Sequence, residues 1–123
     1  MSLNSLIAFD AANQLDQAET ITVTLGRAGV PALSHTTGDL QAFIDRTGHF
    51  QLGSDGHTYT HPLVVWLPIQ PALTTAIADS GHRIQDDSLV TCNEHHHDTT
   101  PKARPIAEII YDGPDGYLLG LTR

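Results

Sequence analysis

The spacing of hydrophobic residues divides the first part of the chain into segments typical of helices and strands. Apolar side chains recur every three or four positions over residues 3–17, which predicts an amphipathic helix. Residues 20–25 alternate threonines with aliphatic residues, a pattern that favours a strand with one buried face. Residues 39–46 return to helical spacing through Leu40 and Ile44, so a second, short helix is expected there.

Two segments in the middle of the chain predict strands. Residues 49–61 place a Gly-Ser-Asp-Gly turn between two polar and aromatic runs, which indicates a β-hairpin. In its register Phe50 faces Tyr59, an aromatic cross-strand pair that stabilises a hairpin. Pro62 then separates the hairpin from the run 63–67, which contains no polar residue. A strand of that kind is buried on both faces, so we expect it at the centre of the sheet.

The second half of the chain predicts one more helix and three more strands. Residues 71–80 begin with proline and are followed by Gly81, a combination typical of a helix with a glycine cap at its C-terminus. Residues 88–93 have the composition of a strand. The segments 105–111 and 117–121 flank a Pro-Asp-Gly turn, so we expect them to form a second hairpin.

Together these elements predict an α+β fold in a single domain over residues 1–123, because no linker or repeat divides the chain. We expect a mostly antiparallel sheet of about six strands packed against three helices, in a single pair of layers. Such a sheet has open edge strands, which proteins either protect against further pairing or pair with a second copy of the chain. Because the apolar strand 117–121 is the last element, we expect a homodimer formed through this edge or the neighbouring hairpin.

Charge and composition narrow the classes of partner and the compartment. The 123 residues include 14 acidic and 6 basic side chains, which gives a formal net charge of -8. That charge argues against binding to nucleic acid or to an anionic membrane surface. Cys92 is the only cysteine, so no disulfide forms within the chain, and the first residues do not resemble a signal peptide. We therefore expect a cytoplasmic protein that binds neither nucleic acid nor membranes.

The eight histidines are the unusual feature of the composition. After Cys92 the chain offers two carboxylates and three imidazoles in succession, groups that zinc and related divalent metals bind. The candidate ligands in this segment are Glu94, His95, His96, His97 and Asp98. A metal site usually takes ligands from two parts of a chain, and His57 and His61 lie on one face of the predicted hairpin. These residues predict a site for a divalent metal such as zinc.

The same histidines also fit a solvent-exposed loop, because the residues that follow them are polar and rich in proline. Cys92 beside Glu94 and His95 offers a further hypothesis, a reactive thiolate, but a lone cysteine on a strand more often packs in a core. No phosphate-binding loop, serine elbow or zinc-protease motif occurs. We therefore expect a non-catalytic module that binds a small ligand or a protein without a cofactor. The alternative is a divalent-metal-binding protein or metalloenzyme.

The second half of the chain resembles that of a vicinal-oxygen-chelate module, the superfamily of glyoxalases and bleomycin-resistance proteins. The resemblance rests on an apolar strand, the helix over 71–81, and the closing sequence Pro-Asp-Gly-Tyr-Leu-Leu-Gly-Leu at 114–121. It implies a metal ligand on the final strand, where the family presents a glutamate and this chain has Gly120. Glycine has no side chain, so the chelating function would be lost, and the opening helix departs from the family pattern.

Overall fold

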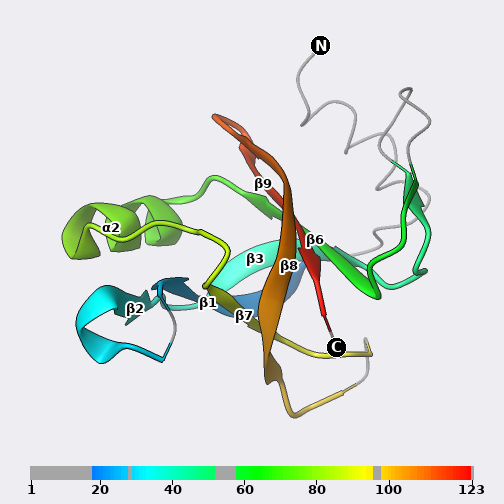
Figure 1. Ribbon diagram of the computed structural model, residues 1–123, viewed down its shortest axis with the longest axis horizontal. Coiled ribbons are helices and arrows are strands. Elements are labelled where there is room, and N and C mark those ends of the chain that lie inside the picture. Colours follow the sequence, from blue (N-terminus) through cyan, green and yellow to red (C-terminus); the bar gives the residue numbers. More distant parts are fainter. Residues whose placement is uncertain (1–17, 28, 52–57, 96–97, 123) are drawn as a thin grey trace.

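The computed structural model describes residues 18–27, 29–51, 58–95 and 98–122, and it consists mainly of β-strands (Figure 1). The strands are β1 (Glu19–Gly26), β2 (Ser34–Thr36), β3 (Leu40–Asp45), β4 (Phe50–Gln51), β5 (Thr58–Tyr59), β6 (Leu63–Pro68), β7 (Leu89–Cys92), β8 (Lys102–Gly113) and β9 (Gly116–Leu121). The helix α2 spans Pro71–Ser80, and one 3-10 turn spans Pro31–Leu33. Among the described residues, no helix is long and apolar enough to cross a membrane.

Six of these strands close into an antiparallel barrel. They pair in the order β1-β3-β6-β9-β8-β7, and β7 pairs back to β1 through Thr22, Val23 and Thr24. β2 pairs with the second half of β1, and β4 and β5 form a separate hairpin. The predicted α+β fold, a sheet packed against three helices, is therefore wrong. The sheet buries its inner face by closing on itself, so it needs no layer of helices.

One of the three predicted helices is present among the described residues. The helix over 71–80 is confirmed as α2, which ends where Gly81 adopts a φ of 73° and its N–H bonds the carbonyl of Ile77. The helix predicted over 39–46 is wrong, because these residues form β3. The helix predicted over 3–17 lies outside the described residues.

The error at β3 has a physical reason. Leu40 and Ile44 pack in the barrel interior, whereas Phe43 packs against a second apolar cluster on the outer face. A strand that carries apolar side chains on both faces no longer alternates between apolar and polar residues. In β3 the large apolar residues are Leu40, Phe43 and Ile44, which are three and four positions apart along the chain. Burial on both sides of the sheet therefore imitates the spacing of a helix.

The other strand predictions are confirmed. The alternating segment 20–25 lies in β1, and the run 63–67 lies in β6, where all five residues are buried. Phe50 pairs with Tyr59 in the short hairpin, as the register predicts. β7 lies within the predicted strand 88–93, and β8 and β9 form the second predicted hairpin.

Apolar side chains from every strand of the ring fill the barrel interior. Leu25, Leu67 and Leu119 have no exposed surface. The helix α2 lies beside β2 and β3 in Figure 1 and packs Leu73 and Ala76 against the same core. The interior is thus a packed core rather than a channel.

A second apolar cluster lies on the outer face of the barrel. Phe43, Trp66, Leu118 and Tyr111 pair in succession across β3, β6, β9 and β8, so they form one transverse row. Phe50 of β4 packs against this cluster and is completely buried. Aromatic packing therefore contributes to holding the β4–β5 hairpin on the outside of the barrel.

The strand on which the expected dimer depends is not an edge. β9 pairs with β6 on one side and with β8 on the other, so it has no free row of hydrogen-bonding groups. The assumption that β9 is an open edge is therefore wrong, and the homodimer, through this strand or the neighbouring hairpin, stays a prediction.

Candidate functional site on the outer face of the barrel

A second transverse row lies next to the apolar one on the outer face of the barrel. Asp45 of β3 pairs with Val64 of β6, Val64 pairs with Gly120 of β9, and Gly120 pairs with Glu108 of β8. Residues directly opposite one another in an antiparallel sheet project from the same face. These four residues, which we call the outer row, therefore place a carboxylate at each end of a short line that has a small residue, Gly120, inside it.

His61 lies over the outer row. Its Nε2 atom is 2.7 Å from Oε1 of Glu108, and the side chains of His61 and Glu108 are 23% and 49% exposed. The ring occupies space that only glycine leaves, because a Cβ atom at Gly120 would fall 2.7 Å from Cγ and Nε2 of His61. The fold thus provides this imidazole with a hydrogen-bond partner, Glu108, and with the space that its ring occupies. We call these two residues the His61–Glu108 pair.

The tautomer of His61 follows from its partner. A carboxylate only accepts hydrogen bonds, so Nε2 carries the proton that is donated to Glu108, and in the neutral ring Nδ1 then carries a lone pair. Among the described residues, His61 makes no other hydrogen bond. The pair therefore has an oriented imidazole with one ring nitrogen available to a ligand.

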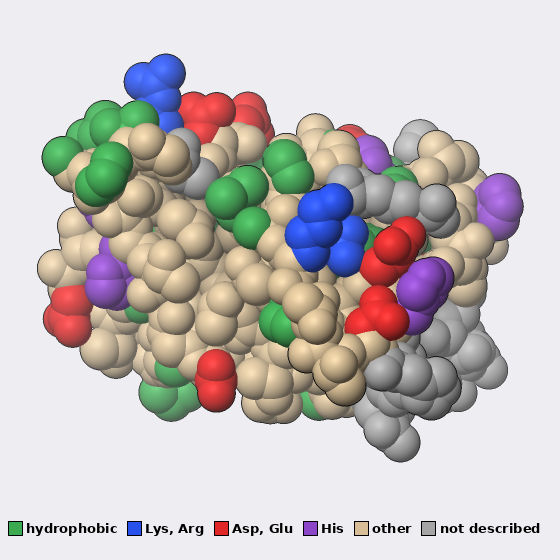
Figure 2. Space-filling view, turned by 90° about the horizontal axis from the view of Figure 1, so that it is seen from below, with side chains coloured by type: hydrophobic (Ala, Val, Ile, Leu, Met, Phe, Trp, Pro, Cys, Tyr) green, Lys and Arg blue, Asp and Glu red, His purple; other side chains and the backbone are tan. Residues whose placement is uncertain are grey.

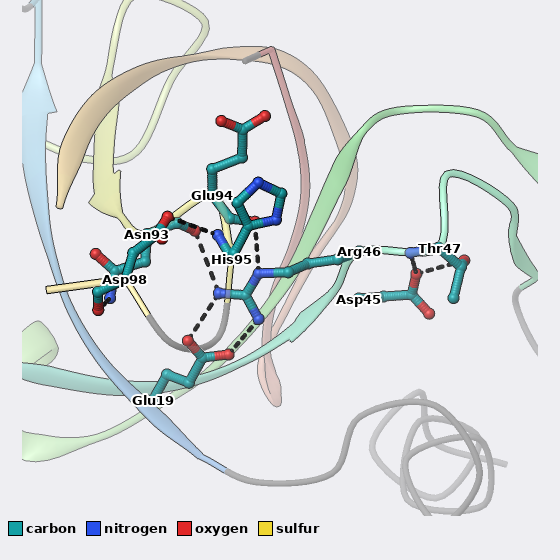
Figure 3. Close-up of polar contacts among 8 residues, drawn as sticks. All are labelled: Glu19, Asp45, Arg46, Thr47, Asn93, Glu94, His95 and Asp98. Carbon is teal, nitrogen blue, oxygen red and sulfur yellow. Dashed lines mark hydrogen bonds and ion pairs between the residues drawn. The ribbon is translucent and has the colours of Figure 1, made fainter. Parts of the chain in front are cut away.

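Asp45, at the other end of the outer row, is buried and only partly hydrogen bonded. Its residue is 1% exposed, and Oδ1 accepts hydrogen bonds from the backbone N–H of Thr47 at 2.9 Å and from the Thr47 hydroxyl at 2.7 Å. Figure 3 shows both contacts. Among the described residues, the buried Oδ2 atom has no hydrogen-bond partner. Such an atom carries an energetic penalty, so the carboxylate of Asp45 is only partly compensated within a largely apolar face.

Arg46 organises a different polar cluster, which joins β1 to the residues after β7 (Figure 3). Its Nη1 and Nη2 atoms donate to the two carboxylate oxygens of Glu19 at 2.6 and 2.8 Å. Nε donates to the carbonyl of Glu94 at 2.9 Å, and Nη2 also donates to that of Asn93 at 3.2 Å. Hydrogen bonding to Glu19 raises the pKa of Arg46, against the opposite effect of partial burial. The guanidinium therefore acts as a structural link.

Hydrogen bonds connect the described residues Asn93, His95 and Asp98 of the predicted metal-binding segment, which we call the turn after β7. Oδ2 of Asp98 accepts a hydrogen bond from the backbone N–H of His95 at 3.0 Å, and the Asn93 side chain donates to the carbonyl of Asp98 at 2.9 Å. The N–H of Asp98 in turn bonds the carbonyl of His95. One carboxylate oxygen of Asp98 is thus used to hold the turn.

The predicted metal ligands are therefore spread over the structure. His61 lies on the outer row with Glu108, whereas Glu94, His95 and Asp98 lie in the turn after β7. Within the described ranges, no three histidine, cysteine, aspartate or glutamate side chains come together as a metal site. His57, His96 and His97 lie outside these ranges, so the complete ligand set stays a prediction.

Cys92 is part of the barrel core rather than a surface nucleophile. The residue is 1% exposed and packs with the interior apolar cluster. Burial raises the pKa of its thiol, and the nearby Arg104 guanidinium lowers it by a smaller amount. Because the thiolate is the reactive form, a buried neutral thiol is a poor nucleophile, which agrees with the core interpretation of Cys92.

Sequence reasoning missed Asp45 and Glu108, and it named Gly120 only as a position on the final strand that lacks a metal ligand. The Pro-Asp-Gly turn fixes the start of the β8–β9 pairing, but the register shifts further along these strands hide that Glu108 lies opposite Gly120. No local signal links Asp45 to the same row, since that link depends on the pairing of β3 with β6 and of β6 with β9.

Figure 2 shows one face of the molecule, on which basic side chains stand next to acidic ones and uncharged surface covers most of the remainder.

Comparison of the chain with protein-family models, with curated proteins and with solved structures finds no match in any of the three. The resemblance to vicinal-oxygen-chelate modules thus gains no support from these comparisons.

Proposed function

We propose that the protein is a non-catalytic binding module that takes a small ligand on the outer face of its barrel, at the His61–Glu108 pair. The observation that carries this proposal is the way in which the imidazole of His61 is held. Gly120 leaves room for the ring, and Oε1 of Glu108, 2.7 Å from Nε2, fixes the orientation of the ring. The groups offered to a ligand, Nδ1 of His61 and the carboxylate of Glu108, are hydrogen-bond acceptors when the ring is neutral. The ligand we expect therefore carries an N–H or O–H donor.

Two features favour binding on the outer surface without chemistry. Side chains fill the interior of the barrel. This is expected, because even a barrel of eight strands encloses only enough space for side chains or one small ligand, and this barrel has six. A histidine that activates a nucleophilic side chain needs that side chain within hydrogen-bond reach, and among the described residues the ring of His61 bonds the carboxylate of Glu108 alone. This arrangement supports recognition by an oriented imidazole.

The proposal is tested by screening a library of small amides and amines by two-dimensional NMR. Compounds with an N–H donor are expected to shift the backbone amide signals of Glu108 and Gly120. His61→Ala should weaken their binding about tenfold, because it removes one hydrogen bond. Gly120→Ala should have a similar effect, because the added methyl group displaces the ring.

The matched control is His35→Ala, which removes an exposed histidine from β2. This variant should bind the same compounds with unchanged affinity. The proposed site would be contradicted if no compound shifted these amide signals. It would also be contradicted if the compounds bound with unchanged affinity to both His61→Ala and Gly120→Ala.

A second candidate function, divalent-metal binding, is favoured by one specific observation. A histidine that ligates a metal through one nitrogen commonly donates its other N–H to a carboxylate, and His61 and Glu108 have that relationship. In this arrangement Nδ1 of His61 would bind the ion and Glu108 would orient the ring. The remaining ligands would come from the predicted residues His57, His96 and His97.

Zinc titration of tag-free protein by calorimetry tests this second function. One zinc per chain is expected, with affinity lowered about 10- to 100-fold in Glu108→Gln, which alters only the orienting group. Binding should be lost in His61→Ala and retained in His35→Ala. Weak uptake of several zinc ions that none of these variants changes would rule the metal function out.

A further inference from the structure

A second part of the surface, separate from the His61–Glu108 pair, has the features of a small-ligand site. A hollow of about 390 Å³ lies where the end of β1 meets the start of β7 and the neighbouring part of β8. The residues that line it and enter the argument are Arg27, Asp86, Asp87, Ser88, Leu89 and Pro105. Its volume lies at the lower end of the range found for small-molecule sites. We call it the β1–β7 hollow.

The floor of the β1–β7 hollow is fixed by buried hydrogen bonds. Ser88 is completely buried, and its hydroxyl donates to the carbonyl of Gly26 at 2.9 Å and accepts from the N–H of Gln85 at 3.0 Å. The N–H of Gly26 bonds the carbonyl of Arg83 at 2.8 Å. The loop before β7 is thus tied to the end of β1, so the hollow does not have to be organised by a ligand.

The charged residues that line the β1–β7 hollow make only a weak ion pair with one another. Nε of Arg27 is 3.8 Å from Oδ2 of Asp87, which is too far for a hydrogen bond, and the two side chains are 62% and 60% exposed. Asp86 lines the same hollow. One guanidinium-bearing and two carboxylate-bearing residues therefore line one space, and within the described part of the chain they make no hydrogen bond to one another that meets the usual distance.

Leu89 and Pro105 supply an apolar part of the lining. Leu89 of β7 pairs with Pro105 of β8, so their side chains lie on the same outer face of the barrel beside the charged groups. A simple anion would meet two carboxylates on a chain of net charge -8, and a simple cation would meet the guanidinium beside the carboxylates, so neither ion matches both signs of charge in the lining.

We propose that the β1–β7 hollow binds a small zwitterion, of the free amino-acid type with an apolar side chain. The ligand carboxylate accepts two hydrogen bonds from Arg27, the ammonium group lies against Asp87 and Asp86, and the apolar side chain covers Leu89 and Pro105. A zwitterion satisfies both signs of charge at once without changing the net charge of the site. This proposal does not depend on the function proposed for the His61–Glu108 pair.

Three probes separate the contributions of the two ligand charges. L-leucine, N-acetyl-L-leucine, which lacks the ammonium group, and L-leucinamide, which lacks the carboxylate, are each titrated into the labelled full chain and followed by NMR. L-leucine is expected to shift the backbone amide signals of Ser88 and Leu89 in a saturable way. Each analogue should bind at least tenfold more weakly, because it leaves one charged side of the hollow unsatisfied.

Variants of exposed residues complete the test without a risk to folding. Arg27→Gln and Asp87→Asn should each weaken L-leucine binding at least tenfold, whereas Asp79→Asn, which removes an exposed carboxylate from α2, should not change it. His61→Ala should also leave it unchanged, which separates this site from the other one. The proposal is overturned if L-leucine causes no saturable shift, if all three probes bind equally, or if binding survives in Arg27→Gln.

Discussion

Replacing Arg46 by alanine is expected to lower the free energy of unfolding by about 3 kcal/mol. The guanidinium makes two hydrogen bonds to Glu19 and two to backbone carbonyls after β7, and the Arg46 and Glu19 side chains are only 19% and 14% exposed. Its loss removes the bidentate partner of a largely buried carboxylate and two donors to the carbonyls. Urea unfolding followed by fluorescence of the single tryptophan measures the effect.

The matched control for Arg46 is Arg27→Ala. Arg27 also pairs with a carboxylate, but at 3.8 Å and with both side chains more than half exposed. This variant should change stability by less than about 0.5 kcal/mol. Equal stability losses in the two variants would show that Arg46 is not a structural link between β1 and the turn after β7.

A loss of about 3 kcal/mol is also expected for Leu118→Ala, from cavity formation in the outer apolar cluster. Leu118 is completely buried and lies directly opposite Trp66. Because the substitution opens space beside that indole, the native fluorescence of Trp66 should change together with the unfolding midpoint. The outer cluster would then act as a second core, in addition to the barrel interior.

Leu33→Ala is the control for this truncation, since it makes the same chemical change at a leucine that is 46% exposed. Its expected effect is below about 0.5 kcal/mol. If Leu118→Ala were equally mild, the packing of the β4–β5 hairpin against the barrel would contribute little to stability.

Local signals explain which elements the sequence could predict. Alternating threonines mark β1, a proline at the start and a glycine after the end mark α2, and the Pro-Asp-Gly turn marks the β8–β9 hairpin. Each signal acts within a few residues, so it is readable without knowledge of the fold. β3 lacked such a signal, because both of its faces are covered by apolar clusters.

Closure of the barrel could not be predicted in the same way. It depends on the pairing of Thr22–Thr24 with Leu89–Thr91, segments that are distant in the sequence, and neither segment specifies the other. An open sheet and a closed barrel require the same alternation in each strand. The sequence therefore predicts five of the six barrel strands, all except β3, and leaves their closure undetermined.

The outer row was hidden by irregular pairing between β8 and β9. Counting back from the hairpin turn, Tyr111 pairs with Leu118, but register shifts at 106–108 and 109–111 then change the alignment. Without the shift at 109–111, Gly120 would face Ile109 rather than Glu108. The carboxylate partner of His61 is thus produced by a β-bulge, a feature that turn chemistry does not reveal.

The position of β9 also has a consequence for how the protein is made. Among the six barrel strands this one comes last in sequence order, yet it lies between β6 and β8. While a ribosome has not yet added Gly116 and the residues after it, both neighbouring strands expose unpaired backbone groups. The nascent chain is then at its most vulnerable to association with other chains. The barrel is completed only after translation of its final strand, and this interval is the stage at which a chaperone would protect it.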